Sequence, residues 1–234
     1  MFHPFSVTET LNIAWLILRK NIATIAVYAL LAVIVIIGSF FIIDIFIDYN
    51  IIIATICGFA LLIGVSFIFL GFIKLVFQLI DKEYYDFEFK DIVPKLRMLL
   101  SYIILLVIVS TLAVLMENAV KKLEEGFLQN ILGILVGIFF EFFFLFYFPI
   151  CTCFVVDDEC GPYESVVQSY RLIKGNFFKY FLLFIIIEAM VFIGSITVIG
   201  IVFVVPFVNI LLVVAYRKLV YSHLDVDDDI TETV

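Results

Sequence analysis

Long apolar stretches with few or no charges alternate with short polar segments along most of this chain. Four of these stretches cover residues 22–43, 51–73, 99–116 and 128–156. A helix needs about 20 apolar residues to cross the roughly 30 Å hydrocarbon core of a bilayer. Each stretch therefore predicts one transmembrane helix.

The last apolar region, which begins at Phe177, is too long to be a single span. Its turn is expected at a group of small and hydroxylated residues, Gly194, Ser195, Thr197 and Gly200. This turn gives spans at 177–196 and 200–220. The sequence thus predicts an all-α fold, a polytopic bundle of about six transmembrane helices in one membrane domain (1–222), followed by an acidic cytoplasmic tail (223–234).

The composition supports a membrane protein rather than a soluble one. Hydrophobic residues make up 65% of the chain and charged residues 15%, whereas about half of the residues in soluble domains are apolar. The net charge of −8 argues against the basic surface that nucleic-acid binders carry. The expected partner is the lipid bilayer, with a membrane-protein partner or a second copy of the chain as further candidates, and no nucleic acid.

Basic residues are distributed unevenly between the two ends of the expected spans. All but two of the 14 lysines and arginines lie at one end, and the exceptions are Lys121 and Lys122. The cytoplasmic loops of membrane proteins carry an excess of Lys and Arg. We therefore expect both termini in the cytoplasm.

Two segments of the chain match at a constant offset of 155 positions, as from Glu9 to Glu164. Each segment directly precedes an expected span, and each is amphipathic at helical spacing. The apolar stripes consist of Val7, Leu11, Trp15 and Leu18 in the first copy and of Val166, Val167, Tyr170 and Ile173 in the second. We expect two short helices along the cytoplasmic surface of the membrane.

Aromatic and basic residues on these segments suit the headgroup layer of the membrane. The interfacial anchors predicted on this basis are Trp15, Arg19, Tyr170, Arg171 and Lys174. A weaker third match covers residues 89–100, where Asp91 and Lys95 have i, i+4 spacing. The expected architecture is then three units, each with a short interfacial helix and a two-helix hairpin.

Several short motifs carry a family resemblance. They are Gly71-Phe72-Ile73-Lys74-Leu75, Tyr85-Asp86-Phe87, Asp91-Ile92, the region 155–176, Pro206 and Ala215-Tyr216-Arg217. In these motifs the whole chain resembles uncharacterised bacterial multipass membrane proteins related to the membrane domain attached to some glycerophosphodiester phosphodiesterases. The resemblance implies the bacterial inner (plasma) membrane as the location. It implies no phosphodiesterase activity, because the sequence leaves no room for that soluble domain.

Glu141 and Glu188 are candidate functional residues, because each falls near the middle of an expected span. A charged carboxylate at that depth costs at least about 2.5–3.5 kcal/mol, so each must be protonated, paired or hydrated. One interpretation is a structural hydrogen bond between helices, with Asn209, Ser66 or Ser110 as the partner. The others are a proton or cation relay, a polar substrate cavity and coordination of a lipid headgroup. Asn209 completes this candidate intramembrane polar site.

The acidic run 157–159 is expected to be a solvated turn, with a divalent-cation site as the alternative. Cys151, Cys153 and Cys160 lie close together in the sequence but have no nearby histidine to complete a metal site. We therefore expect no metal and no cofactor.

Pro149 and Pro206 lie inside expected spans and predict kinks there, with a gating hinge as the functional alternative. The sequence contains no recognisable catalytic motif, such as G-x-S-x-G or H-E-x-x-H, and we expect no enzyme. The pattern favours a non-enzymatic scaffold or a regulatory, lipid-interacting membrane protein. The alternative is a small transporter or channel that uses the midplane carboxylates, and a lipid-processing membrane enzyme is the second alternative.

Overall fold

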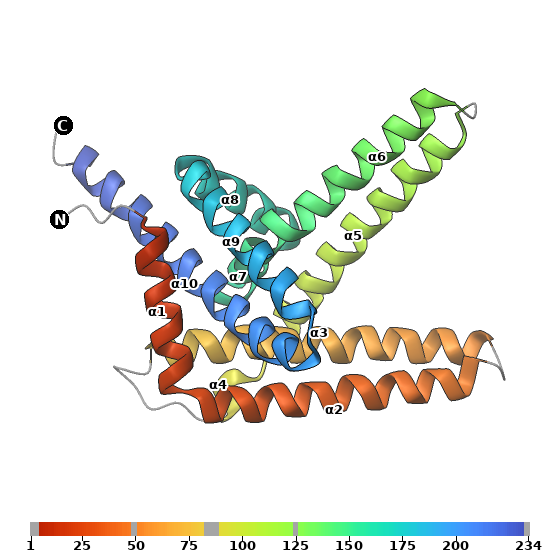
Figure 1. The fold of residues 1–234 in the computed structure, drawn as a ribbon, viewed down its shortest axis with the longest axis horizontal. Coiled ribbons are helices and arrows are strands. Elements are labelled where there is room, and N and C mark those ends of the chain that lie inside the picture. Colours follow the sequence, from red (N-terminus) through yellow and green to blue (C-terminus); the bar gives the residue numbers. More distant parts are fainter. Residues whose placement is uncertain (1–4, 48–50, 82–88, 124–125, 232–234) are drawn as a thin grey trace.

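The computed structural model describes residues 5–47, 51–81, 89–123 and 126–231 (Figure 1). This part of the chain is helical and contains no strand, which confirms the predicted all-α class. Five of its helices are long and apolar enough to cross a membrane, or up to six if the bent pair Val7–Lys20 and Ile22–Gly38 counts as one span.

The long helices form three consecutive hairpins. The first consists of α2 (Ile22–Ile47) and α3 (Ile51–Asp81). The second consists of α5 (Leu96–Lys121) and a helix built from α6 (Phe127–Phe142), η1 (Phe143–Tyr147) and α7 (Phe148–Asp157). The third consists of α9 (Phe177–Ser195) and α10 (Val198–Thr231). A shorter helix precedes each hairpin, namely α1 (Val7–Lys20), α4 (Phe89–Ile92) and α8 (Pro162–Gly175).

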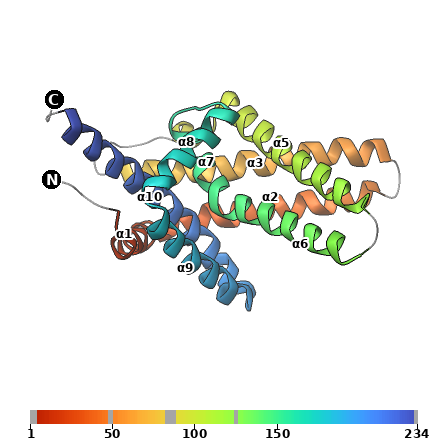
Figure 2. The same cartoon turned by 90° about the horizontal axis from the view of Figure 1, so that it is seen from above.

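The three hairpins diverge from a common region where α3, α7 and α10 contact one another, which we call the hub. We call the hairpins the α2–α3, α5–α6 and α9–α10 arms. Figure 1 shows the α2–α3 arm along the lower edge and the α5–α6 arm pointing to the upper right. In Figure 2 these two arms extend to the right, whereas the α9–α10 arm points downward.

The short helices connect the three units into a ring. α4 packs on α3, and α8 packs on α7, so each lies on the last helix of the preceding hairpin. α1, the first of the described helices, packs on α10, the last of them. The fold therefore has an approximate threefold arrangement in which the first and last helices are neighbours.

The two matching segments fold in the same way. α1 and α8 each contain 14 residues, and their bounds differ by the same 155 positions as their sequences. Each ends at an asparagine with similar backbone angles, φ −119° and ψ 23° at Asn21 and φ −128° and ψ 29° at Asn176. The break at Asn21 turns the chain by 82° between α1 and α2.

The buried face of α1 and α8 shares only Leu18 and Ile173 with the apolar stripes that the sequence predicted at the membrane interface. The buried residues occupy equivalent positions in the two copies: Thr10, Ala14, Ile17 and Leu18 in α1, and Ser165, Ser169, Leu172 and Ile173 in α8. Trp15 is 58% exposed and Tyr170 is 54% exposed. Small side chains are buried because they let each helix approach its neighbour closely, and the hydroxyls of Thr10 and Ser169 bond carbonyls of their own helices at 2.7 Å.

The third, weaker match does not form a comparable amphipathic helix. α4 has only four residues, and Pro94 separates it from α5, because the residue before a proline disfavours helical geometry. Asp91 and Lys95 therefore do not share a helix as their i, i+4 spacing predicted. The Lys74 ammonium donates to the Val93 carbonyl at 2.9 Å and ties this break to α3.

The last two long helices approach each other closely at the turn between them. α9 ends at Ser195 and α10 begins at Val198, so the chain turns where Gly194, Ser195, Thr197 and Gly200 predicted it. A Cβ atom on Gly200 would lie 2.5 Å from the Gly194 carbonyl oxygen. The Thr197 hydroxyl accepts a hydrogen bond from the Gly200 N–H at 3.0 Å and caps the start of α10.

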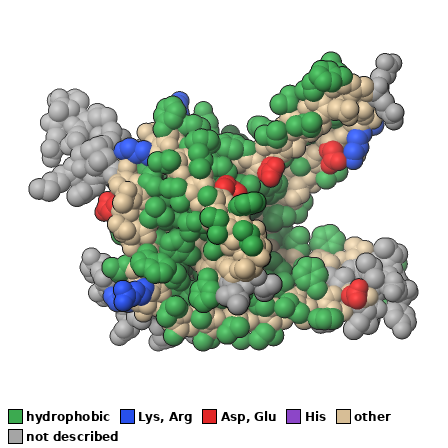
Figure 3. All heavy atoms as spheres, viewed as in Figure 1, with side chains coloured by type: hydrophobic (Ala, Val, Ile, Leu, Met, Phe, Trp, Pro, Cys, Tyr) green, Lys and Arg blue, Asp and Glu red, His purple; other side chains and the backbone are tan. Residues whose placement is uncertain are grey.

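The core lies in the hub, and the arms are mostly exposed. The largest fully buried side chains include Leu70, Leu75, Ile150, Tyr180 and Tyr216, whereas α6 buries none of its residues. Figure 3 shows hydrophobic side chains covering the arms and few charges between the hub and the arm tips. In a membrane, lipid covers such a surface.

Candidate functional site

The candidate carboxylates come from two different arms and lie near each other. Glu141 lies on α6 and is exposed, and Glu188 lies on α9 and is half-buried. The two groups are close enough to interact electrostatically. Their helices meet through aromatic rings, since Phe142 and Phe184 have centroids 6.0 Å apart. The structure thus brings together the two carboxylates that the sequence singled out.

The third member of the predicted polar site lies elsewhere. The Asn209 amide donates to the Val205 carbonyl of its own helix at 2.8 Å. Ser66 likewise donates to the Leu62 carbonyl one turn earlier, at 2.7 Å. Asn209 and Ser66 therefore form hydrogen bonds within their own helices, α10 and α3. Neither forms the interhelical bond to a glutamate that the sequence suggested. Asn209 instead lines a cavity at the hub.

Pro149 follows directly after η1, a π-helical turn. The Phe148 N–H bonds the Phe143 carbonyl, five residues earlier. Proline lacks an N–H, and its ring clashes with the carbonyl four residues before it in a regular α-helix. The π-helical turn changes this geometry, so the helix continues from Phe127 to Asp157. The Tyr180 hydroxyl donates to the Phe146 carbonyl in this turn at 3.0 Å and links α9 to it.

Pro206 is buried inside α10, which continues through it without a break. The structure therefore accommodates each proline in a continuous span, and a gating role for either stays a prediction.

The predicted interfacial anchors lie on exposed surfaces of the hub. Trp15 packs edge-on against Phe207 of α10, with ring centroids 6.1 Å apart. The ring of Tyr170, the equivalent residue of α8, packs near the ring of Tyr147 of η1, with centroids 6.4 Å apart. The remaining predicted anchors, all exposed, are Arg19, Arg171 and Lys174. An amphipathic aromatic ring suits a position between lipid and water.

Arg217 ties the three central helices together at the hub. Its Nη2 atom lies 3.2 Å from Asp81 Oδ2 at the end of α3 and 3.3 Å from Asp157 Oδ1 at the end of α7. Its guanidinium also lies over the ring of Phe77, 4.8 Å from the centroid. The neighbouring Tyr216 hydroxyl donates to Asp157 Oδ2 at 3.1 Å. Sequence reasoning missed this cluster, because it treated Arg217 as a basic residue that orients a span and as part of a family motif, and both acidic partners lie far from it in the sequence.

Two further ion pairs link residues that are distant in the sequence. Lys218 of α10 pairs with Glu9 of α1, and Lys95 pairs with Glu159 after α7. The hydrogen bond from Lys95 holds the pKa of Glu159 below its usual value. Asp157 and Glu159 are thus half-buried and paired, whereas Asp158 is exposed, so the acidic run 157–159 matches the expected solvated turn only in part. Among the described residues, no group of His, Cys, Asp and Glu has the arrangement of a metal site.

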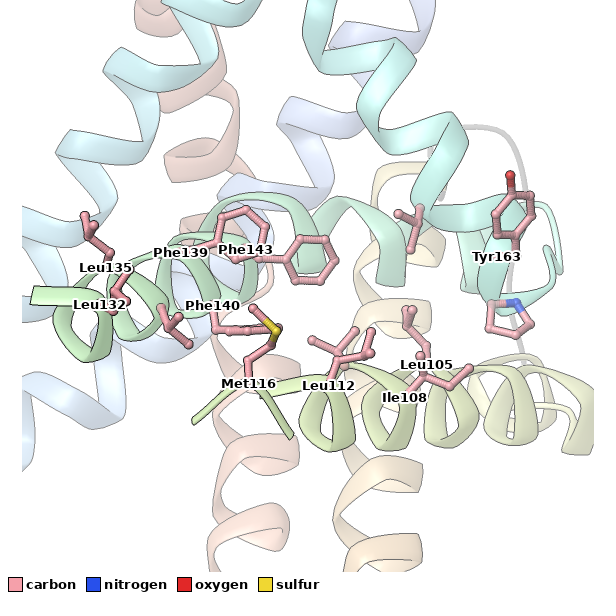
Figure 4. Close-up of a pocket in the computed structure, with 14 residues that line it drawn as sticks. Leu105, Ile108, Leu112, Met116, Leu132, Leu135, Phe139, Phe140, Phe143 and Tyr163 are labelled. Atoms are coloured by element: carbon pink, nitrogen blue, oxygen red, sulfur yellow. The ribbon is translucent and has the colours of Figure 1, made fainter. Parts of the chain in front are cut away.

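An apolar groove of about 650 Å³ lies between α5 and α6 and reaches the start of α8. Figure 4 shows Leu112 and Met116 of α5 facing Phe139 and Phe140 of α6 across the groove, with Tyr163 near one end. Neither Glu141 nor Glu188 lines it. The groove can hold a hydrocarbon chain, and its lining is apolar apart from the hydroxyl of Tyr163.

No family model, curated protein or solved structure matches this chain. The resemblance to uncharacterised bacterial membrane proteins therefore stays a prediction.

Proposed function

We propose that this chain is a non-enzymatic integral membrane protein that holds a lipid acyl chain in its α5–α6 arm and acts as a lipid-interacting scaffold. The groove between α5 and α6 carries the proposal. It runs along α5 from Leu105 to Met116, about 16 Å at 1.5 Å per residue. One leaflet of a bilayer core is about 15 Å thick, so the groove matches the length of one acyl chain.

The hub end of the groove suits the headgroup side of a phospholipid. Tyr163 is 82% exposed at the end near the hub, where an amphipathic ring favours the headgroup layer. The rest of the lining is apolar and comes mostly from α5 and α6, with Phe143 of η1 and Pro162 and Val166 of α8 at the hub end. A bound chain would supply packing contacts that these helices do not make with each other along the groove. The expected membrane is the bacterial inner membrane, with the hub and both termini on the cytoplasmic side.

Lipid retention tests the proposed groove. The purified protein would be washed in a delipidating detergent and examined by native mass spectrometry. We expect the wild type to retain one phospholipid and Leu112→Trp, which fills the groove, to lose it. Leu115→Trp is the control, because Leu115 lies on the same helix, is 59% exposed and does not line the groove. Equal retention by the two variants would refute the proposal.

The orientation has its own test in intact cells. The four native cysteines would first be replaced by alanine. In that background the cysteines of Thr197→Cys and Leu123→Cys lie at the tips of two arms, whereas that of Lys174→Cys lies at the hub. An impermeant thiol reagent added outside is expected to label the first two and spare the third. The opposite pattern would place the hub outside.

The paired carboxylates favour a small transporter as the second candidate. Glu141 and Glu188 interact across two arms, as members of a proton relay would. Vesicles with the wild type, Glu141→Gln or Glu188→Gln would be given a pH gradient, and flux would be followed with a dye. We expect no flux from any of them. Wild-type flux that either substitution abolishes would replace the scaffold with a transporter.

A further inference from the structure

Two smaller cavities adjoin at the hub, away from the α5–α6 groove. A central cavity of about 230 Å³ lies where α3, α5, α7 and α10 meet. A lateral groove of about 250 Å³ lies between α2, α3 and α10. Phe69 and Asn209 line both spaces. A ligand chain in the lateral groove would therefore reach the central cavity beside these two residues.

The two spaces differ in polarity. The lateral groove is almost entirely apolar, and its Tyr28 hydroxyl already donates to the Ile68 carbonyl at 2.7 Å. The central cavity is lined by three polar side chains, Tyr102, Cys153 and Asn209. The arrangement suits an amphiphile whose chain lies in the groove and whose polar end lies in the central cavity.

Tyr102 and Asn209 have hydrogen-bonding capacity left for such a ligand. Tyr102 is 7% exposed, and its ring packs on Phe69 and Phe148 with centroids 5.9 and 5.6 Å away. Within the described residues its hydroxyl has no hydrogen-bond partner. Asn209 uses one N–H for the Val205 carbonyl, which leaves its carbonyl oxygen as an acceptor. A hydroxyl group between them could accept from Tyr102 and donate to Asn209.

The size and charge of the central cavity restrict the head of the ligand. In the described part of the chain, neither lining contains an acidic or basic side chain. An ionised head buried there would lack a partner and lose its hydration. The cavity is also smaller than the roughly 300–1,000 Å³ typical of sites for drug-sized ligands. A small, uncharged head therefore fits, and a phosphate does not.

We propose that the lateral groove and the central cavity bind a single-chain lipid with an uncharged hydroxyl head, such as a long-chain alcohol. Its hydroxyl lies between Tyr102 and Asn209, and its chain runs between α2 and α10. This inference rests on the proposed lipid-binding function but concerns a second site with a different ligand class.

Photolabelling with matched probes tests this site. Full-length protein in nanodiscs would be exposed to a diazirine-bearing hexadecanol, to the sulfate ester with the same chain and to the corresponding alkane. Peptide mapping would locate the label. We expect the alcohol to label α2 and α10 at least ten times more than the sulfate or the alkane, and excess unlabelled hexadecanol to compete.

Three variants separate specific binding from general lipid contact. Asn209→Leu and Tyr102→Phe each remove a polar group at nearly constant size, and we expect labelling to fall about tenfold and threefold, respectively. Tyr221→Phe is the control, since Tyr221 is 57% exposed on α10 and lines neither space, and its labelling should not change. If Asn209→Leu fails to fold, Tyr102→Phe alone decides.

Two outcomes overturn the inference: equal labelling by the three probes, or wild-type labelling in the folded Asn209 and Tyr102 variants. Phospholipid retention in the α5–α6 groove is measured independently. If retention depends on Leu112 but the alcohol labels nothing specifically, only this second site is wrong. If retention does not depend on Leu112, the proposed function itself fails.

Discussion

Cys160 shows how burial controls the reactivity of a single side chain. The thiol is 6% exposed and donates to Gln168 Oε1 at 3.5 Å. Burial, with the nearby carboxylates of Glu164 and Asp158, raises its pKa from 9.0 to about 11. Because the thiolate is the reactive form, two pKa units reduce the reactive fraction at neutral pH about 100-fold.

We therefore expect Cys160 to react slowly with iodoacetamide, and its rate to rise about tenfold per pH unit up to about pH 11. The exposed cysteine of a Lys174→Cys variant provides the comparison, with both rates measured by peptide mapping. Equal rates at pH 8 would show that Cys160 is neither buried nor shifted in pKa.

The absence of a side chain at Gly200 allows α9 and α10 to approach each other closely at their turn. A Cβ atom at position 200 would meet the Gly194 carbonyl oxygen at 2.5 Å, and this backbone atom cannot move aside easily. We expect Gly200→Ala to lower the free energy of unfolding by about 1–3 kcal/mol through overpacking.

Gly137→Ala is the matched control, because nothing lies within 4 Å of its added Cβ atom. It should be neutral or slightly stabilising, since alanine favours helix. Thermal or SDS-induced unfolding in detergent would measure both. A Gly200→Ala protein as stable as the wild type would contradict the close approach of the two helices.

The equivalence of α1 and α8 predicts parallel mutational effects. Ala14 and Ser169 occupy equivalent positions and are both fully buried. We expect Ala14→Leu and Ser169→Leu each to cost about 1–3 kcal/mol of stability. The adjacent, exposed Trp15→Leu and Tyr170→Leu should each change it by less than about 1 kcal/mol. Unfolding midpoints of the four variants would test this, and an effect confined to one copy would break the equivalence.

The sequence predicted where these helices lie better than which face they bury. Span positions follow from long apolar stretches, and the match from Glu9 to Glu164 located both short helices. The apolar stripes with Trp15 and Tyr170 were predicted to lie at the membrane interface. The sequence did not predict which face packs on protein, because apolar side chains are stable against lipid as well as inside protein. In a membrane, small residues such as Ala14 and Ser169 indicate the packed face instead.

Contacts between distant units could not be predicted from sequence. Arg217 pairs with Asp81 and Asp157 because three hairpins converge, and its pair with Asp81 joins residues 136 positions apart. The electrostatic interaction between Glu141 and Glu188 likewise depends on how the α5–α6 and α9–α10 arms pack. The sequence marked both glutamates as costly in lipid, but it contained no information on their separation.

The Arg217 cluster should hold the three units together. Arg217 and Asp157 side chains are 24% and 22% exposed, so the pair lies between a surface ion pair and a fully buried one. We expect Arg217→Gln to cost about 2–3 kcal/mol, because both carboxylates lose their partner. Arg217→Lys should recover only part of this loss, since an ammonium lacks the planar fork.

Lys121→Gln is the control at an arm tip, where Lys121 and Glu117 are 65% and 60% exposed. It should cost less than about 0.5 kcal/mol. Unfolding followed in detergent would rank the three variants. Equal stability of Arg217→Gln and Lys121→Gln would mean that the hub does not depend on its ion pairs.

Lipid in the α5–α6 groove can be located directly with a phospholipid that carries a diazirine in the middle of one acyl chain. The wild-type protein would be delipidated, given about one such lipid per molecule, irradiated and mapped by mass spectrometry. We predict that cross-links concentrate on α5 between Leu105 and Met116 and on the facing residues of α6, which line the groove. The α2–α3 arm exposes similar apolar surface at residues such as Leu30 and Phe59 and should be labelled weakly. Cross-links spread evenly over both arms would contradict a specific acyl-chain site, and with it the proposed function.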